Sequence, residues 1–168
     1  MKKLGFVALF IFGLFVGNIC SAGFPAGTGV KMADGSIEKI ETIKPGEILF
    51  GGGIVEKVVL TTTDKLVVLQ LFEKTIKTTA DQCFFIVGGY SSHGDSVMKC
   101  ENLSVGYWIK CLPYPPTPDF PEKEFSDRIS EKWQEVCKDK IIIYGLKIED
   151  NGKGKGYYFA DDLKAASE

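Results

Sequence analysis

The fold of this chain is decided by the stretch Gly23-Phe24-Pro25-Ala26-Gly27-Thr28-Gly29-Val30-Lys31-Met32-Ala33-Asp34-Gly35-Ser36. Residues 29–32 form a short run with alternating apolar side chains, and the pair Asp34-Gly35 closes it. Asp-Gly is a strong signal for a β-hairpin, because these residue types accept the positive φ angles of a tight turn. An apolar pattern resumes over residues 36–43. The stretch therefore predicts a hairpin near the N-terminus.

The rest of the chain repeats this pattern of short strands separated by turn residues. Strands are expected over residues 47–50, 54–61, 66–72, 75–79, 83–87, 140–148 and 157–160. Strands at such short spacing predict an all-β body. The chain has 168 residues with 45% hydrophobic and 25% charged content, which suits one globular domain with a real core.

One segment departs from the strand pattern. Residues 112–121 are rich in proline, which cannot donate the hydrogen bonds of a sheet interior. In residues 122–138 the apolar side chains recur at helical spacing, as Phe125, Ile129, Trp133 and Val136. We therefore expect one amphipathic helix, inside a helical insertion at about residues 112–139. The proline run is interpreted either as a stiff surface loop or as a polyproline ligand.

The first 22 residues have the composition of a secretory signal peptide. Lys2 and Lys3 precede an apolar run over residues 4–16, and Cys20-Ser21-Ala22 resembles a small-residue cleavage site. We expect cleavage after Ala22, a mature domain over residues 23–168, a secreted or extracytoplasmic location and no stable membrane anchor. Removing Lys2 and Lys3 leaves 18 basic and 22 acidic residues, so the net charge goes from −2 to −4. This acidity disfavours nucleic acid as a partner.

Four cysteines follow the expected signal peptide, namely Cys83, Cys100, Cys111 and Cys137. An even number in an oxidising compartment favours disulfides, whereas buried free thiols are the alternative. Cys111 and Cys137 bracket the proline-rich run and the expected helix, which makes them the candidate pair. No Cys-x-x-Cys pair occurs and His93 is the only histidine, so neither a metal site nor a cofactor is expected.

Several segments together resemble the Hint domains, the family shared by inteins and the hedgehog autoprocessing domain. The family opens with Cys and then Phe-Pro-x-Gly-Thr-x-Val, which residues 24–30 match. Further resemblances are carried in order by residues 40–49, 78–86, 97–109, 143–150 and 158–161. The similarity covers roughly residues 23–163 and implies a horseshoe of short strands, in which Gly23 and the strand near Tyr158 lie close to Thr79.

The resemblance also identifies the positions of the family's chemistry. The family-site positions are Gly23, Thr79, Asp81 and Gln82, of which Gly23 stands at the cysteine nucleophile and Gln82 at the proton-donating histidine. Glycine has no side chain to attack a carbonyl, and glutamine has no proton to give near neutral pH. Read without gaps, Ala166 and Ser167 replace the family's final His-Asn. These replacements predict a catalytically inactive relative.

Two functions remain open at this stage. In the first, the inactive domain binds an extended peptide or a partner protein, with Phe24, Phe84, Tyr158 and Phe159 as candidate apolar lining. In the second, intein- or hedgehog-type self-cleavage persists through a displaced nucleophile, for which Cys83 is the candidate, with His93 as a substitute imidazole. Alternation along a strand disfavours Cys83, because it would point away from the site if Gln82 points into it.

Overall fold

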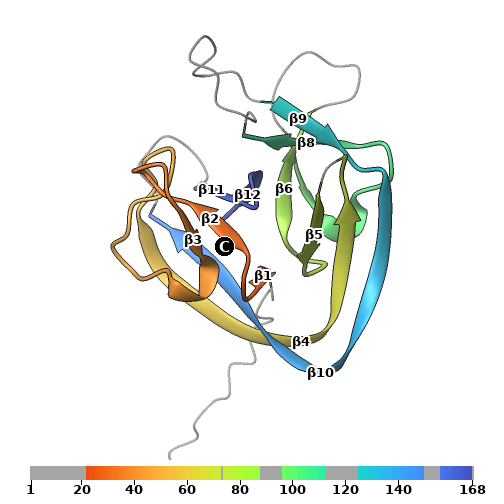
Figure 1. The fold of residues 1–168 in the computed structure, drawn as a ribbon, viewed down its shortest axis with the longest axis horizontal. Coiled ribbons are helices and arrows are strands. Elements are labelled where there is room, and N and C mark those ends of the chain that lie inside the picture. Colours follow the sequence, from red (N-terminus) through yellow and green to blue (C-terminus); the bar gives the residue numbers. More distant parts are fainter. Residues whose placement is uncertain (1–21, 73, 88–95, 113–124, 150–155, 168) are drawn as a thin grey trace, which may run out of the picture.

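The strands of the computed structural model form two antiparallel sheets (Figure 1). The structure describes residues 22–72, 74–87, 96–112, 125–149 and 156–167. The first sheet has the strand order β1-β10-β4-β5. The second has the order β3-β2-β11-β12-β6-β8-β9, with β7 paired to β6. The all-β fold expected from the sequence is thus confirmed.

The first sheet is dominated by a long curved ribbon made of β4 (Val55–Gln70) and β10 (Glu131–Ile148). Their pairing runs from Glu131 opposite Gln70 to Ile148 opposite Val55, with a register shift between Val136 and Ile141. Figure 1 shows this ribbon curving around one side of the molecule, where it forms the outer curve of the horseshoe. At its edges lie β5 (Thr75–Thr78), which forms a hairpin with β4, and the two-residue β1 (Phe24–Pro25). The two strands expected over residues 54–61 and 66–72 are therefore one strand.

The second sheet begins with the hairpin predicted from Asp34-Gly35. Its strands are β2 (Gly29–Lys31) and β3 (Ile37–Lys39), and Gly35 has the positive φ of 87° that the turn requires. The remaining members are β6 (Cys83–Ile86), β7 (Ser96–Lys99), β8 (Trp108–Cys111), β9 (Phe125–Arg128), β11 (Tyr157–Ala160) and β12 (Leu163–Ala166). Two short 3₁₀ helices, η1 (Ile40–Thr42) and η2 (Cys100–Asn102), follow β3 and β7. No helix among the described residues has the length and apolar character needed to cross a bilayer.

The helix expected over residues 122–138 is wrong. Within the described part of that segment, residues 125–128 form β9 and residues from 131 onward form β10. Only Ile129 of the four apolar residues is fully buried, whereas Val136 is 70% exposed. The pairing with β4 supplies hydrogen-bond partners along one edge of β10 over residues 131–136 and 141–148, and this tertiary interaction overrides a local helical pattern.

Lys132 on β10 links the first sheet to the segment around η2, which follows β7 of the second sheet. Its ammonium group donates hydrogen bonds to the carbonyl oxygens of Cys100 (2.8 Å), Glu101 (2.8 Å) and Leu103 (2.6 Å). These carbonyls lie in and just after η2, and the Cys100 carbonyl oxygen also accepts from the Leu103 amide. One side chain of the ribbon therefore fixes the second sheet to the first.

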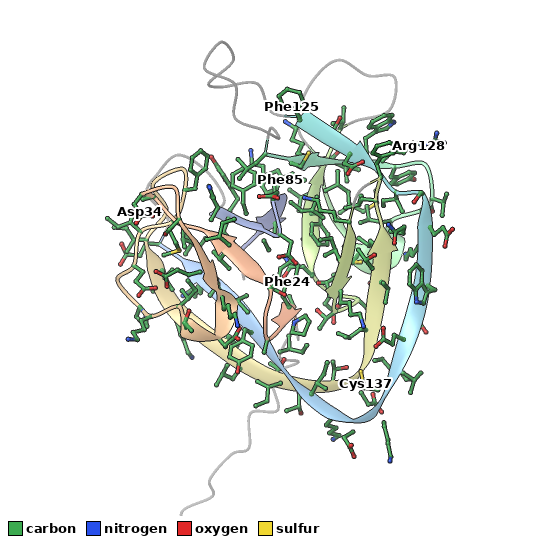
Figure 2. The ribbon with its side chains drawn as sticks, viewed as in Figure 1. Phe24, Asp34, Phe85, Phe125, Arg128 and Cys137 are labelled. Carbon is green, nitrogen blue, oxygen red and sulfur yellow. The ribbon has the colours of Figure 1, made fainter. Side chains whose placement is uncertain are left out.

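The predicted bridge between Cys111 and Cys137 is not formed, because both residues are free thiols. Cys137 lies on β10 at the far bend of the ribbon, whereas Cys111 belongs to β8 at the opposite end of the molecule (Figures 1 and 2). The bridge was expected because a loop and a helix between the two cysteines would have formed a compact insertion with its two ends close together. The extended ribbon separates them instead.

Candidate functional site

The main chain of Gly23 is held by two threonines, Thr78 at the end of β5 and Thr79 directly after it. The Gly23 amide donates to Thr79 Oγ1 at 3.1 Å. In return, Thr78 Oγ1 at 2.8 Å and the Thr79 amide at 3.1 Å donate to the Gly23 carbonyl oxygen. Gly23, Thr78 and Thr79 are all buried. The predicted proximity of Gly23 and Thr79 is present in the structure.

The site has no room for a side chain on residue 23. Gly23 has a φ of 151°, in the range that favours glycine. A Cβ atom at this position would overlap the carbonyl oxygen of Tyr144 and lie 2.8 Å from its carbonyl carbon and 2.9 Å from Ile143 Cγ2. Since Tyr144 belongs to β10 and two of these atoms are backbone, a side chain would have to displace the ribbon itself. At the position that aligns with the family's nucleophile, the chain therefore has no side chain, and the Tyr144 backbone fills the space that one would need.

Gln82 stands at the position where the resemblance places a histidine, and its backbone amide donates to the Thr79 carbonyl oxygen at 3.3 Å. Its side chain is buried, and Nε2 donates to the carbonyl oxygens of Ala166 (3.0 Å) and Cys83 (2.9 Å). Ala166 is the last residue of β12, so Gln82 ties the C-terminal strand to the start of β6. The structure therefore brings Gln82 and Ala166 together, as the resemblance implies, but the contact is a structural hydrogen bond between neutral groups.

Asp81 points away from this arrangement. Its carboxylate pairs with Lys99 at 2.9 Å, and the side chain is 36% exposed. Such half-exposed pairs contribute little to stability. Asp81 therefore belongs to the outer surface of β6 and β7 rather than to the group of residues around Gly23.

Cys83, the candidate displaced nucleophile, also lies outside the site. It is half-buried, while the neighbouring Gln82 is 1% exposed, as strand alternation predicts. Its thiol contacts the carbonyl oxygen of Asp81 at 3.7 Å. Burial raises the pKa of the nearby Cys100 thiol to about 12, so Cys100 is protonated at neutral pH. His93 lies outside the described residues.

The four aromatic residues proposed as a binding surface belong to the core. Phe24 and Phe84 are 0% exposed, Tyr158 is 1% exposed and Phe159 is 5% exposed. The Phe24 ring packs edge to face against Phe84 and Tyr158, with ring centroids 6.0 and 6.1 Å apart. Figure 2 shows Phe24 at the centre of the molecule, between the two sheets. Phe24 itself fills the space between Phe84 and Tyr158, whereas Phe159 packs against Phe50 and Tyr157, so these rings present almost no exposed surface.

Sequence reasoning missed two contributors to the site. Thr78 makes the shortest hydrogen bond to Gly23, and alternation along the strand over residues 75–79 could have indicated its inward orientation. Tyr144 contributes through its backbone, for which a sequence carries no local signal. Within the described residues no group of three or more potential metal ligands occurs.

The comparisons with known proteins agree with this geometry. No protein-family model matches the sequence, and no curated protein matches it significantly. Among solved structures, the chain is similar to a bacterial intein-like domain from Clostridium thermocellum, with 23% identity and a TM-score of 0.65 over 87% of this chain and 98% of that one.

Two inteins show the same fold at lower identity. A DnaB intein from Synechocystis sp. PCC 6803 has 16% identity and a TM-score of 0.65, over 88% of this chain and 99% of that one. The gp41-1 intein has 15% identity and a TM-score of 0.63, over 86% of this chain and 97% of that one. Similarity along nearly the whole of each chain, together with the contact between Gly23 and Thr79 that the sequence resemblance implies, identifies this protein as a domain with the intein-like Hint fold.

Proposed function

We propose that this protein is a secreted Hint-fold domain that has lost self-cleavage and uses the former cleavage site to hold an extended chain. The observation that carries the proposal is the closed position of residue 23, where the Tyr144 carbonyl occupies the space that a nucleophilic side chain would need. A nucleophile must reach the carbonyl that it attacks, and no side chain can be placed there without moving β10.

The remaining groups around Gly23 support the loss of catalysis. The hydrogen-bond partners of Gly23 are two threonine hydroxyls and one backbone amide. None of these groups gains or loses a proton near neutral pH, so none can act as a general acid or base. Gln82 is committed to two carbonyl oxygens. These groups orient a peptide well but provide no general acid or base.

The groups around Gly23 bind the amide and carbonyl of an extended main chain. The Gly23 amide and carbonyl are both paired, and the adjoining β1 adds a short strand to the edge of β10, with Phe24 opposite Tyr144. Addition of an extended segment to a sheet edge, with a side chain in a pocket, is a common mode of peptide recognition. In this structure the bound segment belongs to the chain itself.

The experiment is a cleavage assay on the chain with a soluble reporter domain in place of residues 1–21. We expect no release of the reporter over days at neutral pH, with or without dithiothreitol. The variants Thr79→Val and Gln82→Leu serve as matched controls for background hydrolysis. Release by the native chain that exceeds both controls would establish residual autoproteolysis and refute the proposal.

A second variant tests the closed position directly. The double substitution Gly23→Cys with Gln82→His restores the two missing reactive groups, yet we expect it to remain inactive because the new Cβ would fall on the Tyr144 carbonyl. Thiol-dependent release by this variant would mean that β10 yields easily and that only the residue types prevent cleavage.

Export is the remaining part of the proposal, and it is supported by the basic start, apolar run and small-residue site in residues 1–22. The intact mass of the protein recovered outside the cytoplasm tests it. A mass that corresponds to a chain starting at Gly23 is expected, whereas retention of residues 1–22 would refute cleavage after Ala22.

A further inference from the structure

We propose that Asn102 is a site of N-linked glycosylation, at which an oligosaccharide is attached to the side-chain amide. The inference rests on the export part of the proposed function, because the transferases that make this linkage act on chains that enter a secretory compartment. Asn102 is the last residue of η2, the short helix between β7 and β8. Its sequence context, its exposure and its surroundings each support the assignment.

The sequence context is Asn102-Leu103-Ser104. An acceptor asparagine requires a serine or threonine two residues later and any residue except proline between them. The other asparagines, at positions 18 and 151, have no hydroxyl side chain at that spacing. A three-residue motif often occurs by chance, so the placement of its side chains in the folded chain decides whether it can carry a glycan.

The fold directs both groups of the motif to solvent. Leu103 is 2% exposed, whereas Asn102 and Ser104 are exposed. The backbone of Leu103 is extended, with a φ of −68° and a ψ of 143°. Successive side chains of an extended segment point in opposite directions, so the two polar side chains point outward together when the leucine points into the core. An oligosaccharide at Asn102 therefore extends into solvent without disturbing the packing of Leu103.

The segment is fixed by contacts that do not involve the Asn102 side chain. The backbone amide of Cys100 donates to the Gln82 carbonyl oxygen at 2.7 Å, and that of Glu101 donates to the Ala80 carbonyl oxygen at 2.9 Å. These hydrogen bonds join η2 to the start of β6 through main-chain groups alone. A substituent on the Asn102 amide removes none of them.

The residues that follow the motif provide a reason for a polar cover. The Tyr107 amide donates to the Ser104 carbonyl oxygen at 3.1 Å and closes a surface turn directly after the motif. Large apolar side chains are exposed here, since Val105 is 57% and Trp108 48% exposed. An N-linked oligosaccharide is bulky and solubilising, so at Asn102 it would shield this turn from contact with other proteins.

The reaction is a group transfer from a lipid-linked oligosaccharide diphosphate, which the secretory compartment supplies. A bond forms between Asn102 Nδ2 and the anomeric carbon of the first sugar. The bond between that carbon and the diphosphate oxygen breaks, and the lipid diphosphate leaves with the electron pair. The amide nitrogen loses one proton to the transferase, so the product is a neutral, substituted amide.

The experiment produces the full chain in a secreting eukaryotic host, once with its own residues 1–22 and once with a host secretory signal in their place. The intact mass of the secreted protein is measured before and after treatment with peptide-N-glycosidase, which removes the glycan and leaves aspartate. The variants Asn102→Gln and Ser104→Ala each remove one required group. Ser104→Thr keeps the hydroxyl and is the matched control.

We expect the native chain and Ser104→Thr to carry the additional mass of one oligosaccharide, which the glycosidase removes. Asn102→Gln and Ser104→Ala should lose this mass completely. An unmodified native chain secreted with the host signal, or an oligosaccharide that persists in Asn102→Gln, would overturn the assignment. Modification with the host signal but not with residues 1–22 would support the glycosylation site and refute export by those residues, so the two failures are distinguishable.

Discussion

The substitution Gly23→Ala tests the central feature of the site, because it adds a single methyl group where the structure has no space. The new Cβ would overlap the Tyr144 carbonyl oxygen and crowd Ile143 Cγ2 at 2.9 Å. Overpacking in a well-packed core usually costs about 1–3 kcal/mol. A backbone conformation that suits only glycine adds about 1–2 kcal/mol. The free energy of unfolding should therefore fall by roughly 2–5 kcal/mol, which lowers Tm by about 10 °C in a chain of this size.

Two other glycines separate the two contributions. Gly35 has a φ of 87° with open space around it, so Gly35→Ala measures the cost of the backbone angle alone. Gly53 lacks a positive φ, and the one close contact of its Cβ would be with a side-chain atom, Ile148 Cγ2 at 2.9 Å, whereas the Tyr157 carbonyl oxygen lies at an ordinary 3.7 Å. Gly53→Ala therefore measures a contact that can relax.

Thermal and chemical unfolding of the three variants, followed by circular dichroism, provides the measurement. We expect the loss at Gly23 to exceed that of either control. If Gly23→Ala is no more destabilising than Gly35→Ala, the position is not closed by Tyr144, and the argument for inactivity fails.

The remaining predictions concern the framework around the site. Lys132→Met removes three hydrogen bonds to carbonyl oxygens and should cost about 2–3 kcal/mol in urea unfolding, whereas the exposed Lys57→Met should change little. Burial raises the pKa of Cys100 from 9.0 to about 12, so the thiol loses its proton at a lower pH in the unfolded state than in the folded state. The free energy of unfolding should therefore fall as the pH rises from 9 to 12. In Cys100→Ala this contribution to the pH dependence should disappear from unfolding curves measured at alkaline pH. Asp162 has a φ of 64°, which glycine adopts with less strain, so Asp162→Gly should raise Tm slightly although it removes the half-exposed ion pair with Lys74. A lower Tm would mean that the ion pair contributes more to stability than the strained backbone angle costs.

Much of the fold could be predicted from the sequence because its signals are local. The Asp34-Gly35 turn and the hairpin around it depend on residues that are adjacent in the chain. The order of the short strands, together with the resemblance that they carry, also indicated that Gly23 would lie close to Thr79. This prediction holds in the structure. The peptide-binding role and the signal peptide remain predictions.

The failures share a physical cause, which is that the decisive partner lies far along the chain. The apolar spacing from Phe125 to Val136 fits a helix, and only the pairing with β4 makes it a strand. Phe24 and Tyr158 were assigned to a binding surface because a sequence does not reveal that Phe24 itself fills the space between the sheets.

The sequence by itself determined which residues are present at the site, and hence that a cysteine nucleophile and a proton-donating histidine are missing. The tertiary structure decided that the position of residue 23 is closed, because the obstacle is the carbonyl group of Tyr144, 121 positions further along the chain. A backbone atom is common to every residue type, so its role leaves no mark in the sequence. Such a role becomes visible only when the folded chain brings β10 against Gly23.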